Sequence, residues 1–216
     1  MKPIRLLAAL ALFTGVAACA TPETVSRSVM IDNVSAPTLG TETAAPTLNV
    51  TGLVVEVPRA LRVSEANLFY PGGDIVWRED PAGDRHEQVK AIFEAGMEQG
   101  LAGLPQGEIP VRLHVEVTRF HALSEKARYT VGGVHAVQFL LTLQDPQTGR
   151  ALTEPRLVKA DFRAYGGRTA MEAEARGETQ KFRITQRLAS VIQHELLAPG
   201  STSTAGLGLV GALNQL

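Results

Sequence analysis

The most reactive side chain in this sequence is the thiol of Cys19, the only cysteine among 216 residues. Three small residues, Val16-Ala17-Ala18, stand directly before it and follow the apolar run Leu6–Phe13. Lys2 and Arg5 flank the start of that run, so the order of basic, apolar and small residues is that of a secretory signal. The run is too short to span a hydrocarbon core of about 30 Å. A lone cysteine in a secreted chain needs an explanation, and acylation of the thiol supplies one.

The segment Val16–Cys19 resembles the lipobox of bacterial lipoproteins. In that family the thiol is alkylated with diacylglycerol, the chain is cut before the cysteine, and the new amino group receives a fatty acyl chain such as palmitate. The resemblance therefore implies that residues 1–18 are a signal peptide and that Cys19 is the lipid attachment site. Two or three acyl chains would hold the protein on a membrane almost permanently, whereas one holds it only marginally. The alternative is an ordinary cleaved signal peptide followed by an unpaired cysteine.

The residues after Cys19 predict which membrane holds the anchor. In bacterial lipoproteins an Asp at this place typically retains the protein at the inner membrane. This chain has Ala20 and Thr21 instead. The resemblance therefore favours the outer membrane over the inner membrane, with the protein facing the periplasm.

The charge of the mature chain gives no support to nucleic-acid binding. Loss of Lys2 and Arg5 leaves 19 basic residues against 22 acidic ones, a net charge of −3. Nucleic-acid-binding domains usually carry a basic patch or stripe. No second apolar run approaches the length of a membrane span.

The motifs that would indicate catalysis or cofactor binding are missing from the sequence. The histidines form neither His-x3-His nor His-Glu-x-x-His, and there is no Gly-x-Ser-x-Gly and no Walker A sequence. The sequence therefore predicts no catalytic residue, no metal ligand and no cofactor, and hence no enzyme. A metal site assembled from distant histidines stays an open alternative. The five histidines are His86, His114, His121, His135 and His194.

Two groups of charged residues could form a docking surface. One precedes the last predicted helix and is either a solvated face or a binding loop for a basic partner: Arg168, Glu172, Glu174, Arg176 and Glu178. The other occupies the polar positions of predicted strands and is either solvated sheet or a docking face: Arg112, His114, Glu116, Lys159, Asp161 and Arg163. Three glycine pairs, Gly72-Gly73, Gly132-Gly133 and Gly166-Gly167, are explained by turns better than by ligand contact.

Hydrophobic periodicity predicts the elements that position these residues. Strands are expected at residues 48–57, 75–77, 109–118, 137–143 and 158–164, with a polar loop at 122–133. Asp84 and Glu87 approximate a capping box for a helix that ends at Gly103. A second helix is expected over residues 178–197. Its predicted buried stripe is Phe182, Thr185, Leu188, Val191, Ile192 and Leu196, and its polar face is Arg183, Gln186, Arg187 and Gln193.

This order predicts an α+β fold, with an antiparallel sheet of about four strands and two helices packed on one of its faces. Val115 and Phe139 are expected in the core, because each lies mid-strand on the apolar parity. The predicted domain organisation is a signal peptide at 1–18, an acylated cysteine and flexible tether at 19–47, a single domain at 48–198, and a mobile tail at 199–216. A tail that docks on a partner is the alternative.

With its lipobox, Pro- and Thr-rich tether and element order, the chain resembles small envelope lipoproteins of Gram-negative bacteria. The turn Asp145–Gly149 and the pair Gly166-Gly167 also fit. Families of unknown function and the auxiliary lipoproteins of lipid-transporting ABC systems share this pattern. The resemblance implies a non-enzymatic binding or accessory module in envelope transport or assembly, with an unidentified envelope protein as partner. A tethered enzyme or small-ligand binder and a purely structural lipoprotein are the alternatives.

Overall fold

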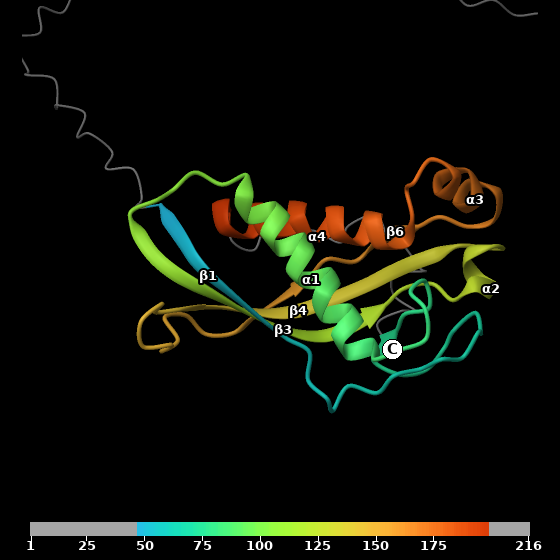
Figure 1. Cartoon of the computed structure of the whole chain (residues 1–216), viewed down its shortest axis with the longest axis horizontal. Coiled ribbons are helices and arrows are strands. Elements are labelled where there is room, and N and C mark those ends of the chain that lie inside the picture. Colours follow the sequence, from blue (N-terminus) through green and yellow to red (C-terminus); the bar gives the residue numbers. More distant parts are fainter. Residues whose placement is uncertain (1–46, 199–216) are drawn as a thin grey trace, which may run out of the picture. The chain divides into compact units, whose positions relative to one another are not determined.

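The strands join into one mixed six-stranded sheet in a computed structural model that describes residues 47–198 (Figure 1). The predicted signal peptide, Cys19, the tether up to residue 46 and the tail 199–216 lie outside the described residues. None of the described helices is both long and apolar enough to cross a bilayer. In chain order the elements are β1 (Leu48–Glu56), β2 (Ile75–Val76), α1 (Arg85–Ala102), β3 (Ile109–His121), α2 (Glu125–Arg128), β4 (Gly133–Gln144), β5 (Arg156–Lys159), β6 (Phe162–Ala164), α3 (Gly167–Ala175) and α4 (Gln180–Leu197).

The strand order is β1-β3-β4-β5, with β2 also paired to β3 and β6 also paired to β4. The α+β class is confirmed, but the prediction of a purely antiparallel sheet is wrong. β1 and β2 both run parallel to β3, with Val55 opposite Val115 and Ile75 opposite Phe120. The reason is that α1 carries the chain from β1 and β2 back across the sheet, and such a crossover joins parallel strands. The pairs β3–β4, β4–β5 and β4–β6 are antiparallel, as expected.

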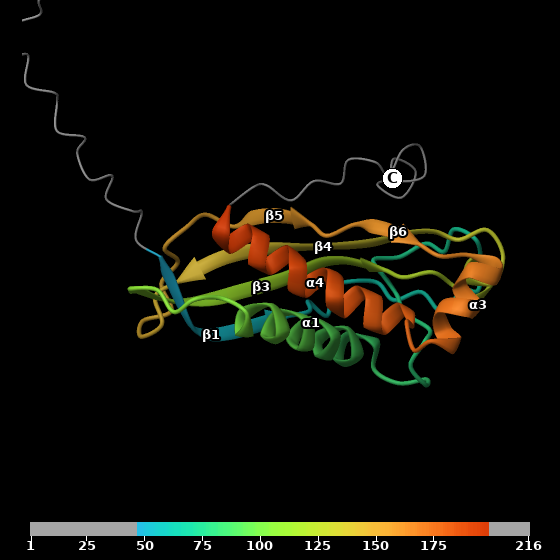
Figure 2. The same cartoon turned by 90° about the horizontal axis from the view of Figure 1, so that it is seen from above.

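The long helices α1 and α4 lie side by side over one face of the sheet (Figure 2). Their close approach depends on glycine, because a Cβ atom at Gly100 would lie 2.4 Å from Ile192 Cγ2 and 2.5 Å from Ala189 O. The predicted start of α1 is confirmed: the Asp84 side chain accepts hydrogen bonds from the backbone N–H groups of His86 and Glu87.

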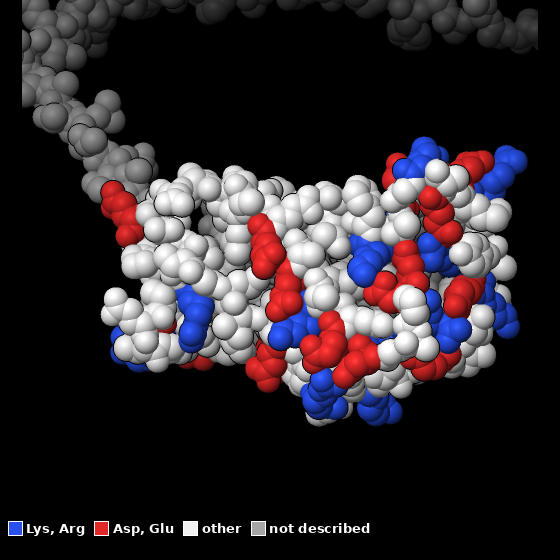
Figure 3. All heavy atoms as spheres, viewed as in Figure 1, with Lys and Arg blue, Asp and Glu red and all other residues white. Residues whose placement is uncertain are grey.

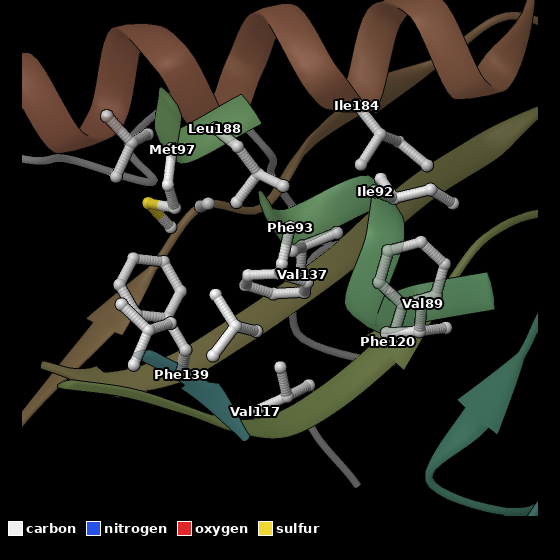
Figure 4. Close-up of a cluster of buried hydrophobic side chains, with 14 of the residues drawn as sticks. Val89, Ile92, Phe93, Met97, Val117, Phe120, Val137, Phe139, Ile184 and Leu188 are labelled. Atoms are coloured by element: carbon white, nitrogen blue, oxygen red, sulfur yellow. The ribbon is translucent and has the colours of Figure 1, made fainter. Parts of the chain in front are cut away.

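Aromatic and aliphatic side chains from α1, α4 and the sheet fill the space between these layers (Figure 4). Phe139 and Val115 are both fully buried, which confirms the prediction for these two residues. The Phe139 ring meets the Phe93 ring edge-on, with centroids 5.7 Å apart. Trp77 meets Phe120 in the same way, also at 5.7 Å.

The predicted buried stripe of the last helix needs correction at its first turn. Phe182 is 49% exposed, whereas Ile184 is fully buried. Two residues turn a helix by about 200°, so the two side chains lie on opposite sides of α4. Ile184, Leu188 and Ile192 form the stripe that packs inward.

The expected strand at 158–164 is interrupted, and Asp161 is not on a polar face. The Asp161 side chain is buried, and its carboxylate accepts hydrogen bonds from Val137 N at 2.9 Å and Gln138 Nε2 at 3.0 Å. It takes the place of a backbone partner and so separates β5 from β6. Burial raises the pKa of this carboxyl group.

Two helices were not expected from the sequence. α2 lies within the expected loop at 122–133. α3 contains the first part of the charged stretch that precedes α4. Both are short, and a helix of one or two turns leaves little periodicity to detect.

Candidate binding site at the aromatic end of the domain

Exposed aromatic side chains gather at one end of the domain, where α2 and α3 lie. Tyr70 is 74% exposed, Tyr129 45% and Tyr165 37%, and these are the three tyrosines of the whole chain. Phe69, beside Tyr70, is also exposed. We call the part of the molecule around these four residues the aromatic end. The other large aromatic side chains of the domain are mostly in the core, so the exposed set is selective.

A hollow of about 560 Å³ opens at the aromatic end between loops far apart in sequence. Tyr70 and Tyr165 stand at its rim, and Val131 and Val134 line it with apolar surface. Arg163 is the only charged residue among its lining residues. The volume lies within the range of about 300–1,000 Å³ that is typical of ligand pockets.

Glycines set the shape of this hollow. Gly132 has a φ of +73°, a conformation that favours glycine. A Cβ atom at Gly166 would lie 2.0 Å from Gly132 N, so the two segments touch through their main chains. Turn-making was predicted for the glycine pairs. It fits the positive φ of Gly132 and Gly167, but Gly166 is required by close packing instead.

His135 lies on the other side of the same strand from the hollow, because it follows Val134 and successive residues of a strand point to opposite faces. Its ring is fully buried, and neither ring nitrogen has a hydrogen-bond partner among the described residues. The Phe162 ring lies 4.9 Å away. Burial lowers the pKa of His135, and together with the charges of Arg183 and Arg128 it brings that pKa to about 3. The cavity beside it, about 10 Å³, has room for about one water molecule.

Two buried or half-buried arginines tie α3 to α2 and α4 to β6. Arg128 forms ion pairs with Glu174 on α3 and with Glu79, the latter at 3.8 Å. The Arg183 guanidinium stacks 3.6 Å from the centre of the Tyr165 ring and donates a hydrogen bond to Arg163 O at 2.9 Å. Burial lowers the pKa of Arg183. These cations therefore support the walls of the hollow rather than its interior.

The model of a family of unknown function (DUF6778) matches residues 48–212. The chain belongs to this family. The prediction of an unknown-function family is thus confirmed, while the likeness to auxiliary lipoproteins of ABC systems stays a prediction. No curated protein matches the DUF6778 chain.

Two solved structures show distant likeness to the DUF6778 chain. One is a protein from Caulobacter crescentus described as a candidate lipoprotein, with 15% identity over 50% of this chain and 79% of that one, and a TM-score of 0.30. The other is a Xanthomonas campestris protein of the DUF330 family, with 15% identity over 70% of this chain and 86% of that one, and a TM-score of 0.38. At these TM-scores neither likeness says anything about the function of this chain.

The structure does not bring the histidines of the DUF6778 chain together. Each lies in a different setting: His86 contacts Leu61 O, His114 pairs with Glu56 at 3.3 Å, His121 contacts Gly73 O at 2.9 Å, and His194 lies in the last turn of α4. Within residues 47–198 no three His, Cys, Asp or Glu side chains are grouped as metal ligands would be.

The charged groups singled out in the sequence are divided between roles. Of the strand positions, only Arg163 reaches the hollow. Arg112 donates hydrogen bonds to Gln144 Oε1, and Asp161 is buried. Of the stretch before α4, Arg168 and Glu172 are exposed, as predicted for a solvated face, but Glu174 is held by Arg128.

Sequence reasoning missed the hollow, although a signal for it is present. Each of the three tyrosines stands within three residues of one of the three glycine pairs: Tyr70 before Gly72-Gly73, Tyr129 before Gly132-Gly133, and Tyr165 before Gly166-Gly167. That coincidence, repeated three times, marks the loops that meet at the aromatic end.

Proposed function

We propose that this chain is a lipid-anchored protein of the cell envelope whose domain binds another envelope protein through its aromatic end. The binding serves transport or assembly and involves no catalysis. The anchor is Cys19, and the outer membrane, on its periplasmic side, is the favoured location. The observation that carries the proposal is the exposure of Tyr70 and Tyr165 beside one hollow, with Tyr129 exposed at the same end of the domain.

The position of the aromatic end supports this function. The first and last described residues lie together at the opposite end of the domain (Figures 1 and 2). There Leu48 pairs with Ile109 at the start of β3, and Arg156 forms an ion pair with Glu195 near the end of α4. The 12 residues of β4 run from the aromatic end to this one, a length of about 40 Å. The aromatic end is therefore the end of the domain remote from Leu48, where the described chain begins.

The composition of the aromatic end is typical of a protein interface. Tyrosine and arginine are enriched at interfaces and carry much of the binding energy, whereas the rim is polar. Acidic and basic side chains are interspersed on the face shown in Figure 3, and they gather on the half that holds α2 and α3. An exposed aromatic group inside a charged surround is the arrangement expected of a docking site.

A photo-crosslinking experiment in cells tests this function. p-Benzoylphenylalanine replaces Tyr70 at the aromatic end or, as the matched control, Leu152, which is 46% exposed near the other end. We expect a discrete crosslinked protein from position 70 and none from position 152. Identical products from both positions, or none from either, would contradict the proposal.

The anchor is tested separately by Cys19→Ala and cell fractionation. We expect the variant to leave the membrane fraction. A variant that partitions as wild type does would show that lipid is not the anchor.

A further inference from the structure

We infer that the hollow at the aromatic end takes an extended segment of the partner protein that carries an acidic side chain next to apolar ones. This inference rests on the proposed function, because it names the chemistry that the same site would recognise. It is carried by the lining of the hollow and by the charge of Arg163.

The charge of the hollow is positive and uncompensated. Arg163 is exposed, and among residues 47–198 no acidic side chain lies within ion-pair distance of its guanidinium. Most other arginines at this end have such a partner: Arg128 pairs with Glu174, and Arg78 with Glu125 at 2.5 Å. An arginine presented at a pocket without a counter-ion favours a ligand with a carboxylate, to which its planar fork can donate two hydrogen bonds.

The remaining lining favours apolar side chains on the ligand. Val131 is 75% exposed, Val134 is buried, and both line the hollow together with Tyr70 and Tyr165. Covering Val131 and these rings would remove apolar surface from water, which is favourable by about 25 cal/mol per Å².

A peptide fits this hollow better than a hydrocarbon chain does. Its lining residues include Gly132, Gly133, Gly166 and two tyrosines, which bring main-chain polar groups and hydroxyl groups to this part of the surface. A hydrocarbon chain would take these polar groups out of water without bonding to them, and that costs free energy. An extended peptide brings its own N–H and C=O groups and can bond to them.

Selection from a random heptapeptide library tests the inference, with the full lipidated chain held in nanodiscs as the target. We expect the wild type to enrich peptides that combine Asp or Glu with aliphatic or aromatic residues. Arg163→Glu should reverse the charge and enrich Lys or Arg instead. The matched control Arg150→Glu alters an exposed arginine in the turn at the other end, and it should select as wild type does.

A second variant tests the hollow itself. Thr169 is exposed on α3 and lines the hollow, so Thr169→Trp should fill part of it without disturbing the core. A selected peptide should bind this variant about tenfold more weakly than wild type.

The inference is overturned if wild type selects no acidic peptides, or if Arg163→Glu selects the same ones. Its failure is distinct from that of the proposed function. A crosslinked partner at position 70 without acidic selection would refute only the peptide chemistry, whereas absence of any crosslink would refute the function in cells.

Discussion

Polar and aromatic side chains have different surroundings at the two ends of this domain. Where the described chain begins and ends, two arginines are held by partners within the domain: Arg156 pairs with the buried Glu195, and Arg112 donates to Gln144 Oε1 at 2.9 Å. At the aromatic end, Tyr70 and Arg163 face solvent around a hollow. These arginines of the first end therefore have partners inside the domain. Tyr70 and Arg163 of the second end are open to a ligand.

The comparison also holds for the glycines. Gly100 lets α1 approach α4 in the layer that covers the sheet, where the Ile192 side chain and the Ala189 main chain lie against it. Gly132 and Gly166 instead bring main chain against main chain at the aromatic end. The first contact serves the core, and the second shapes a surface.

The largest effect should come from a change in the core, because both ends of the domain depend on it. Phe139→Ala deletes a fully buried ring that contacts Phe93, and we expect a loss of about 3–5 kcal/mol in the free energy of unfolding. Denaturant unfolding of the full chain measures it. A loss below about 0.5 kcal/mol would mean that the β4 register is different from the one described.

Disruption of the glycine contact should act on the aromatic end first. In Gly166→Ala the new Cβ would meet Gly132 N at 2.0 Å, so the segments must separate, at a cost of about 3 kcal/mol. Gly72→Ala is the control, because nothing lies within 4 Å of its Cβ position. Equal unfolding free energies for the two variants would show that Gly132 and Gly166 do not touch.

Acid should weaken the aromatic end through His135. The pKa of this residue is about 3 in the folded protein against 6.5 ordinarily, so between these values the unfolded chain binds the extra proton. Stability is therefore lost as pH falls through 6.5, by about 2 kcal/mol between pH 7 and pH 5.

The variant His135→Phe should remove that pH dependence, whereas His194→Gln, at the exposed last turn of α4, should keep it. Unfolding free energies measured at pH 5 and pH 7 decide the matter. If the three proteins share one pH profile, His135 is not the buried neutral group described.

The smallest effects on stability should come from the rim. Tyr70→Ser removes a ring that is 74% exposed, and we expect a change within about 0.5 kcal/mol. Tyr165→Ser also loses the stacking of Arg183 and should cost about 0.5–1 kcal/mol. Both variants should bind selected peptides more weakly than wild type. Unchanged binding in both would place the docking surface elsewhere.

The helices and strands with long periodic patterns could be predicted from the sequence, and the local corrections could not. The N-cap residue Asp84 was sufficient to predict the start of α1, and the alternation around Val115 was sufficient to predict β3. The parallel pairing of β1 was not predictable from alternation, since a half-buried strand has the same pattern in either direction. The burial of Asp161 depends on Val137 N, a partner 24 residues away.

The candidate site was less predictable than the fold. Arg163 was among the residues proposed for a docking face. The sequence could not show that Arg163, on the short strand β6, reaches the hollow whereas Arg112 and Asp161 do not. The hollow arises from loops around residues 70, 131 and 165, whose meeting is set by tertiary packing. Cys19 lies outside the described residues, and its lipid attachment stays a prediction.

The main-chain contact between Gly132 and Gly166 bears on the entropy of binding. Two backbones in van der Waals contact have no rotamers to rearrange, so one wall of the hollow is already in place before a ligand arrives. Ordering of rotamer-rich side chains at an interface costs roughly 0.5–1.5 kcal/mol each. A site shaped partly by glycine main chain avoids part of that cost, and a short peptide segment could then bind with useful affinity through few contacts.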